Sequence, residues 1–146
     1  MRLYTIGFTK KNACEFFGLI KKNNIEILLD IRLNNKSQLA GFTKGTDIAY
    51  FLAEICGCKY KHCLEFAPTK DILEGYKKGN ISWDEYVEQY TALIFKRGDY
   101  KNFKDKYSDY KNVCLLCSEV TATYCHRRLA AEIIAKENTQ IDIKHI

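Results

Sequence analysis

Short apolar runs alternate along this chain with segments whose apolar residues recur at helical spacing. The runs are expected to form strands at Leu3 to Ile6, Ile25 to Ile31, Lys59 to Cys63, Val113 to Cys117 and Ile141 to Ile146. The second run is almost continuously apolar, as in an inner parallel strand that is buried on both faces. The alternation predicts an α/β fold of three layers, with a mostly parallel sheet of about five strands and helices on both faces.

Segments of helical period predict the elements that connect these strands. Asn12 and Glu15 form a capping-box pattern ahead of an apolar stripe, so a helix is expected from about Ala13 to Lys22. Further helices are expected around Ile48 to Ile55, from about Ile72 to Lys78, from Ser82 onward and from about Tyr124 to Lys136. The polar segment from Leu33 to Thr46 is the longest expected loop, and long loops in compact domains are often lids or binding loops.

Length and cysteine usage narrow the class of protein. The 146 residues suit one domain spanning residues 1–146. No apolar run approaches the roughly 18 residues that cross a bilayer, so no membrane association is expected. The first residues predict a strand rather than a signal peptide. Seven cysteines, an odd number at irregular spacings, argue against a disulfide framework and suit a cytoplasmic protein with mostly buried thiols.

The net charge is mildly positive. A formal charge of +5 and an isoelectric point near 8.8 permit an anionic partner without requiring one. The basic groups concentrate in Lys21-Lys22, Lys96-Arg97 and the stretch 101–111, where a solvated surface is the simpler interpretation. With 10 tyrosines and 8 phenylalanines, a nucleic-acid-associated binding module stays open as an alternative function.

Three of the expected strands end in polar residues. They end in Thr5-Ile6-Gly7, in Asp30-Ile31-Arg32 and in Cys117-Ser118-Glu119. In open parallel sheets, ligands bind beyond the carboxyl ends of the strands, because the loops and helix N-termini there face one crevice. The sequence therefore predicts a working site at this edge, formed by Thr5, Gly7, Asp30, Arg32, Cys117, Glu119, Cys125, His126 and Arg127.

Strand alternation and helical spacing orient some of these side chains. Asp30 and Arg32 lie two residues apart and point to one side, where they form either an ion pair or part of a catalytic set. Helical spacing turns His126 toward the sheet edge. Arg127, together with the free N–H groups at the start of the last helix, predicts an anion-binding crevice.

Two motifs of cysteine enzymes are discounted. Cys114 and Cys117 match a C-x-x-C pattern, but residues three apart on a strand point to opposite faces. This argues against a thioredoxin-like role. The spacing from Cys117 to Arg127 does not fit the C-x5-R loop of cysteine phosphatases.

A metal site is a further hypothesis. Cys117, Cys125 and His126 are of metal-ligand type, with Glu119 or Asp30 as a further ligand. Adjacent residues on a helix diverge by about 100°, which disfavours a shared ion at Cys125 and His126. A site without metal is therefore preferred.

Several pieces of the chain together resemble a known family. They are Thr5-Ile6-Gly7, Asp30-Ile31-Arg32, Tyr60 to Glu65 with His62, the Tyr76…Trp83…Tyr90 segment, Cys117-Ser118-Glu119, Cys125-His126-Arg127 and His145-Ile146. In these pieces the chain resembles domain of unknown function (DUF) family 488, small uncharacterised α/β proteins of bacteria and archaea. It departs from the family pattern at Phe8-Thr9 and in the loop from Leu33 to Ser37. The resemblance adds His62 to the residues expected to contact a substrate, and it implies no reaction or cofactor.

Three functions are weighed for the predicted site. In the first, an enzyme acts on a nucleotide or other phosphate-bearing substrate, with Cys117 as nucleophile or polar contact and Asp30, Glu119 or His126 as acid or base. Substrate contacts would come from Thr5, Gly7, Arg32, His62 and Arg127. The second is the nucleic-acid-associated module. The third is a metal-binding or redox-sensing protein that uses Cys117, Cys125 and His126.

Overall fold

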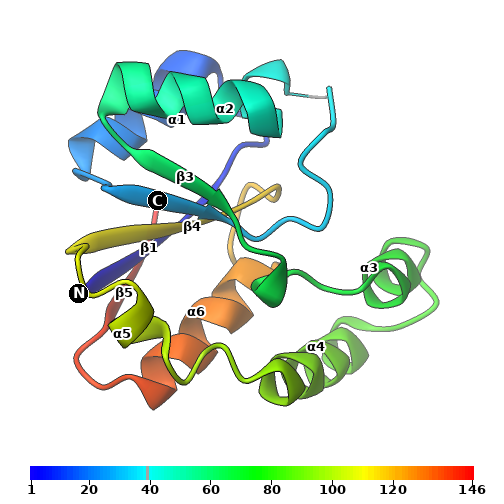
Figure 1. The fold of residues 1–146 in the computed structure, drawn as a ribbon. Helices are drawn as coiled ribbons and strands as arrows, with labels where there is room; N and C mark the ends of the chain where they lie inside the picture. Colours follow the sequence, from blue (N-terminus) through cyan, green and yellow to red (C-terminus); the bar gives the residue numbers. More distant parts are fainter. Residues whose placement is uncertain (39) are drawn as a thin grey trace.

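Five parallel strands form the central sheet. The computed structural model describes residues 1–38 and 40–146, and it orders the strands β3-β2-β4-β1-β5 (Figure 1). The strands are β1 (Arg2–Gly7), β2 (Ile27–Asp30), β3 (Lys59–His62), β4 (Asn112–Cys117) and β5 (Asp142–His145). Every pairing among them is parallel, so all carboxyl ends lie at one edge of the sheet. The predicted sheet is confirmed.

Helices cover both faces of the sheet and complete the three-layer α/β arrangement (Figure 1). One face carries α1 (Ala13–Lys22) and α2 (Gly45–Phe51), which continues as a π-helical turn over Leu52–Cys56. The other face carries α4 (Trp83–Arg97), α5 (Phe103–Lys106) and α6 (His126–Glu137). A further helix, α3 (Lys70–Lys77), packs on α4 and lies farther from the sheet.

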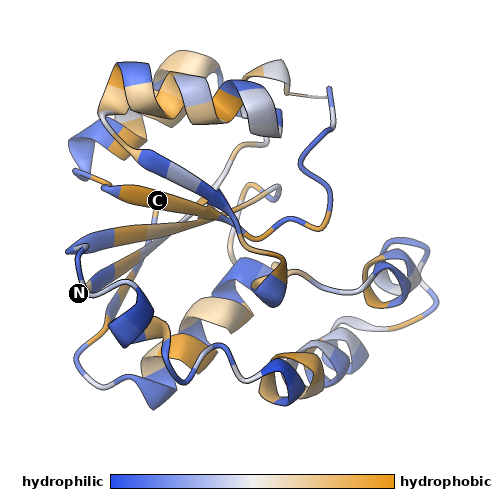
Figure 2. Cartoon of the chain, viewed as in Figure 1, coloured by the Kyte–Doolittle hydropathy of each residue, from blue (hydrophilic) through white to orange (hydrophobic). Residues whose placement is uncertain are grey.

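Alternate residues of the strands enter two separate cores. One core holds Tyr4, Ile6, Leu28, Cys114 and Leu116 against α1 and α2. The other holds Leu3, Leu29, Val113 and Leu115 against α4 and α6. Figure 2 shows hydrophobic residues along β2 and β4, the strands that lie inside the sheet. Burial on both faces accounts for their nearly continuous apolar sequences.

Side chains at the helix starts explain where α1 and α4 begin. The Asn12 side chain accepts a hydrogen bond from the Glu15 N–H at 2.8 Å, and the Asn12 N–H donates to the Glu15 carboxylate at 3.0 Å. These reciprocal bonds confirm the predicted capping box. Ser82 likewise accepts from the Glu85 N–H at 3.2 Å. Both contacts satisfy N–H groups that have no partner within the helix.

Several boundaries differ from those predicted, and two of the differences concern segments at the carboxyl edge of the sheet. The last helix begins at His126 rather than near Tyr124, because a turn from Ala122 to Cys125 precedes it and Cys125 is extended, with φ −138° and ψ 138°. The loop predicted from Leu33 to Thr46 is shorter, since residues 41–43 form a 3-10 turn and α2 begins at Gly45. Leu39, within that predicted loop, lies outside the described residues.

Among the residues that the structure describes, no helix combines the length and the apolar character needed to cross a membrane.

Candidate functional site

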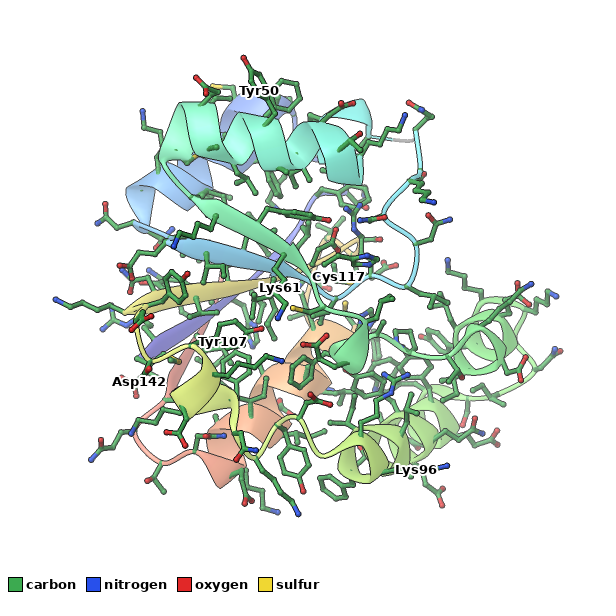
Figure 3. All side chains as sticks on the ribbon, viewed as in Figure 1. Tyr50, Lys61, Lys96, Tyr107, Cys117 and Asp142 are labelled. Carbon is green, nitrogen blue, oxygen red and sulfur yellow. The ribbon has the colours of Figure 1, made fainter. Side chains whose placement is uncertain are left out.

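A cavity of about 410 Å³ opens at the carboxyl edge of the sheet. It lies between the ends of β2 and β4, the start of α6, and the helices α3 and α4. Figure 3 places Cys117 at the end of the sheet that is nearer to α3 and α4. The lining residues are of three kinds: cysteine and histidine at the sheet edge, aromatic and aliphatic residues from the helices, and polar residues from the loops. The sheet-edge group consists of Cys117, Cys125 and His126.

Cys117 and His126 face each other at this edge. Cys117 is the last residue of β4 and is 5% exposed. Its Sγ lies 3.6 Å from Nδ1 of His126, the first residue of α6. The other ring nitrogen, Nε2, lies 2.9 Å from the carbonyl oxygen of Ile31, to which it donates its proton. In the neutral ring, this assignment leaves Nδ1 as an acceptor for the Cys117 thiol.

The surroundings of Cys117 favour its thiolate form. The pKa of Cys117 lies below its ordinary value, because the Cys125 thiol and the N–H groups of Ser118 and Glu119 donate hydrogen bonds to its sulfur. The positive charge of Arg127 acts in the same direction, and together these effects outweigh burial. The pKa of Cys125 is raised, because it donates to Cys117, is buried and lies beside the Cys117 charge. Of the two thiols, Cys117 therefore ionises first.

Arg127 holds the loop that supplies these N–H groups. The guanidinium is buried, and its Nη1 donates to the Glu119 carbonyl at 2.5 Å. Nη2 donates to the Val120 carbonyl at 3.3 Å, and Nε to the Thr5 hydroxyl at 3.3 Å. Arg127 and Thr5 thus lie behind the cavity wall, where they support the site and are not among the residues that line it.

Gly7 is required for the same loop to approach the sheet. It pairs with Cys117 across the β1–β4 ladder. A Cβ atom at position 7 would overlap the Glu119 carbonyl oxygen and lie 2.7 Å from Nη1 of Arg127. Only glycine leaves room for this contact, so the role of Gly7 is a close backbone approach rather than a turn.

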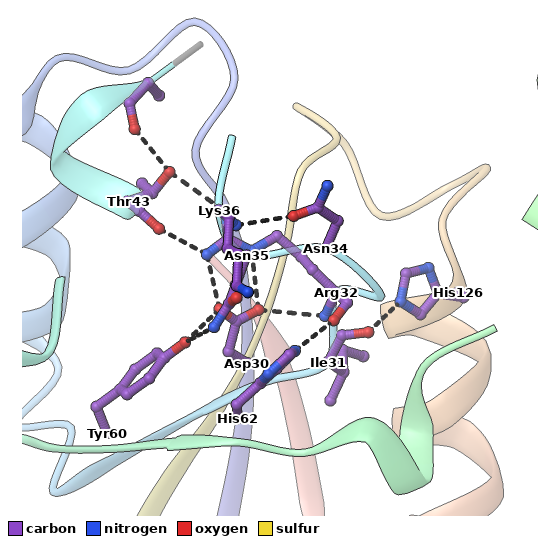
Figure 4. A network of polar contacts seen from close by, with 11 residues as sticks. Asp30, Ile31, Arg32, Asn34, Asn35, Lys36, Thr43, Tyr60, His62 and His126 are labelled. Atoms are coloured by element: carbon purple, nitrogen blue, oxygen red, sulfur yellow. Dashed lines mark hydrogen bonds and ion pairs between the residues drawn. The ribbon is translucent and has the colours of Figure 1, made fainter. Parts of the chain in front are cut away.

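Asp30 and Arg32 form a buried ion pair (Figure 4). Arg32 donates to both Asp30 oxygens, from Nη2 at 2.6 Å and from Nε at 2.8 Å. Arg32 also donates to the carbonyl and hydroxyl oxygens of Thr43, at 2.7 and 3.3 Å. Tyr60 donates to Asp30 at 2.7 Å. The ion-pair interpretation is therefore the one observed, and the charge of Arg32 is balanced within the protein.

His62 lies beside Arg32 of this ion pair. Its Nε2 is 2.7 Å from the Arg32 carbonyl oxygen (Figure 4). It lines a second hollow together with Tyr60, Lys36 and Lys44, not the cavity that holds Cys117. His62 thus contacts Arg32, which lines the cavity that holds Cys117, but His62 itself is not among the residues that line that cavity.

The sequence-based interpretation missed the aromatic wall of the cavity. Trp83 stacks on Tyr86 with ring centroids 5.1 Å apart and an interplanar angle of 12°. Tyr124 meets Trp83 edge-on at 5.5 Å, and Tyr76 contacts both Trp83 and Tyr86. The helical spacing of Trp83 and Tyr86 is that of core positions and does not by itself indicate a cavity wall. The one available signal was the resemblance, which included the Tyr76…Trp83…Tyr90 segment.

Three potential metal ligands lie together at the sheet edge. The ligand atoms of Cys117, Cys125 and His126 are all within 4.8 Å of one another. The expectation that Cys125 and His126 would diverge was wrong, because Cys125 precedes the helix and is extended. Glu119 lines the cavity but is exposed, and it acts on Cys117 through its backbone N–H. By contrast, the opposite orientation of Cys114 and Cys117 is confirmed, since Cys114 packs on the α1 side of the sheet.

Comparisons with known proteins give one match. The family model described as "Domain of unknown function DUF488" matches residues 12–134. The matched range contains Asp30, Arg32, Cys117 and the Cys125-His126-Arg127 segment, and it excludes β1 and β5. No curated protein and no solved structure matches the chain significantly.

Proposed function

The chain belongs to the DUF488 family, domains of unknown function, and we propose that it is an enzyme that acts on a small molecule through Cys117. The observation that carries this proposal is the contact between the Cys117 thiol and His126, whose outer nitrogen is fixed by the Ile31 carbonyl. A nucleophile, a base and a group that orients the base are the three parts of an activated cysteine.

Each residue of the site has its own role in the proposed reaction. His126 Nδ1 takes the proton of the Cys117 thiol, and the sulfur attacks an electrophilic atom of the substrate. The same proton then returns from Nδ1 to the leaving group, so that the histidine acts first as base and then as acid. Ser118, Glu119 and Cys125 stabilise the thiolate before attack. Arg127 has an indirect role, because it positions the loop that supplies the N–H groups of Ser118 and Glu119.

The cavity lining indicates the kind of substrate. Trp83, Tyr86 and Tyr124 offer flat apolar surfaces on which a planar ring can lie. Lys77 is an exposed cation at the same cavity and lies within α3. A molecule with an aromatic ring and an anionic group fits both features, and nucleotides are such molecules. The proposed substrate is therefore a nucleotide or a similar phosphate-bearing compound.

A panel of nucleotides and phosphate esters tests this assignment. A compound bound in the cavity should raise the melting temperature of the wild-type protein and should have little effect on Trp83→Leu. It should also slow the reaction of Cys117 with iodoacetamide while leaving that of Cys14, which is exposed, unchanged. Compounds that stabilise the protein without protecting Cys117 would place the binding site elsewhere and contradict the proposal.

A second candidate function is metal binding, favoured by the grouping of Cys117, Cys125 and His126. Two thiolates and one imidazole suit zinc, and a metal-ligating histidine ordinarily donates its outer N–H to a carbonyl, as His126 does to Ile31. All three residues line the cavity, so an ion that they held would be within reach of a molecule bound there. The ion would then activate a water molecule or polarise a substrate, in place of nucleophilic attack by Cys117.

Metal analysis separates the two candidates. For the metal candidate, the purified protein should carry about one equivalent of zinc, and a chelator should lower its melting temperature. Chelation should also accelerate the labelling of Cys117, which the ion would have blocked. For the nucleophile candidate, chelation should leave both the melting temperature and the labelling rate of Cys117 unchanged.

A further inference from the structure

We propose that Cys125 is a resolving cysteine, which joins Cys117 in a reversible disulfide after a hydroperoxide has oxidised Cys117. This inference rests on the proposed reactivity of Cys117 and adds a means of switching the same site off. It assigns to Cys125 a function of its own, beyond support of the neighbouring thiolate.

The two sulfur atoms are placed for this reaction. They lie within 4.8 Å of each other, and a disulfide needs about 2.05 Å, so the atoms must approach by less than about 3 Å. Cys125 is extended and precedes α6, so this movement does not require unwinding of the helix. Both cysteines line the cavity, which gives a small oxidant access to them.

The other cysteines are poorly placed to compete as partners. Cys58 and Cys114 are buried in the core on the opposite face of the sheet, and Cys14 and Cys56 belong to the helical segments that cover that face. Cys63 lies in the core with Phe66 and Tyr107, and its thiol contacts the Tyr107 hydroxyl at 3.6 Å. Cys125 is the cysteine that donates a hydrogen bond to Cys117. Selectivity for one partner therefore follows from position alone.

The chemistry balances in two steps. The Cys117 thiolate attacks one oxygen of the peroxide, the O–O bond breaks, and the departing oxygen takes a proton to leave as an alcohol or water. Cys117 is then a sulfenic acid. The Cys125 sulfur loses its proton and attacks the Cys117 sulfur, the S–O bond breaks, and the hydroxide leaves as water. Two thiols are oxidised, the hydroperoxide is reduced, and an external dithiol restores the starting state.

A cation lies beside the second sulfur. Nη1 of Arg127 is 3.7 Å from Sγ of Cys125. A positive charge at this distance favours the negative charge that Cys125 carries as it attacks the oxidised Cys117.

Mass spectrometry of the oxidised protein tests the inference. The full chain is treated with hydrogen peroxide, free thiols are blocked with N-ethylmaleimide, and the chain is cleaved after Glu119, which lies between the two cysteines. We expect fragments that contain Cys117 and Cys125 to be linked, with a mass about 2 Da lower than that of the two free thiols. Dithiothreitol should separate the fragments and restore the reactivity of Cys117 toward iodoacetamide.

Two variants make the result specific. In Cys125→Ser, peroxide should leave Cys117 as a sulfenic acid that dimedone traps, and continued exposure should oxidise it irreversibly. Cys14→Ser, which changes an exposed thiol on α1, should form the same linked fragments as the wild type.

Failure of this inference is distinguishable from failure of the proposed function. If Cys117 reacts rapidly with iodoacetamide but peroxide yields no link to Cys125, the resolving role is wrong and the nucleophile stands. If Cys117 reacts with neither reagent faster than Cys14, both assignments are overturned. Equal irreversible oxidation of Cys117 in the wild type and in Cys125→Ser would also overturn the resolving role.

Discussion

Arg32 donates to both carboxylate oxygens of Asp30, at 2.6 and 2.8 Å, within a site where both side chains are buried. The sequence predicted that these two residues would point to the same side but left open whether they would bind each other or a substrate. Because Arg32 is also bound to Thr43, its charge and its donors are used within the protein. The positive charge that binds an anionic substrate at the cavity would thus come mainly from Lys77.

The first prediction concerns this ion pair. Asp30→Asn should lower the free energy of unfolding by about 3–5 kcal/mol, because it leaves the buried guanidinium without its counter-charge. Urea denaturation gives the value. Glu74→Gln is the matched control, since Glu74 and Lys78 form an exposed pair at 3.8 Å, and it should cost less than about 1 kcal/mol. Equal losses in the two variants would contradict the structural role of Asp30.

A second prediction separates two glycines. Gly7→Ala should destabilise the protein and slow the labelling of Cys117, because the new Cβ displaces the loop that carries the Glu119 N–H. Gly18→Ala, on the exposed side of α1, meets no atom of the described residues within 4 Å and should stabilise the protein by about 0.5–1 kcal/mol. Thermal melts and iodoacetamide kinetics on both variants check this. A Gly7→Ala protein that labels at the wild-type rate would contradict the placement of the loop.

The third prediction concerns the hydrogen bond from Cys125 to Cys117. In Cys125→Ala this donor is absent, so the pKa of Cys117 should rise and less thiolate should be present at neutral pH. A hydrogen bond to a charged group contributes about 1.5–3 kcal/mol, so labelling of Cys117 at pH 7 should slow by about tenfold or more. Cys114→Ala changes a thiol on the other face of the sheet and should leave the rate unchanged. Equal labelling rates of Cys117 in the wild type and in Cys125→Ala would exclude this hydrogen bond as the cause of the lowered pKa of Cys117.

A fourth prediction tests the aromatic wall without knowledge of the substrate. N-phenyl iodoacetamide should label Cys117 faster than iodoacetamide does, because its ring can pack against Trp83 and Tyr124. Tyr124→Ala should remove much of this preference and, since the side chain is 61% exposed, change the stability by less than about 0.5 kcal/mol. Phe95→Ala, an exposed aromatic residue that does not line the cavity, should preserve the preference. An equal loss of this preference in Tyr124→Ala and in Phe95→Ala would show that the preference does not depend on the aromatic wall of the cavity.

The sequence predicted those parts of the site that depend on strand order and alternation. Gly7, Asp30 and Cys117 are the last residues of three parallel strands, and such strands end at the same edge. The convergence of Cys117 and His126 followed from the same geometry, once the last helix was placed after β4. These are local patterns combined with one rule of topology.

Other parts of the site depend on tertiary contacts that no local pattern contains. Trp83 and Tyr86 follow the spacing of a buried helix face, and only the position of α3 and α4 beside the sheet edge makes them a cavity wall. The placement of Cys125 depended on a helix boundary two residues away from the predicted one. The sequence predicted Arg127 as an anion ligand, but its guanidinium donates to the carbonyl groups of Glu119 and Val120. These residues belong to a loop without periodicity, so no local pattern predicts the contact.

The reactivity of Cys117 is the central claim, and a brief alkylation measures it directly. The protein is exposed at pH 7 to limiting iodoacetamide, quenched and digested, and the modified fraction of each of the seven cysteines is counted by mass spectrometry. Cys117 should be modified first, ahead of the exposed Cys14, although Cys117 is only 5% exposed. In His126→Gln, Cys117 should no longer be modified ahead of Cys14, because glutamine cannot take the thiol proton. If Cys117 is modified no faster than Cys14 in the wild-type protein, it is a buried thiol at a strand end and the proposed nucleophile is wrong.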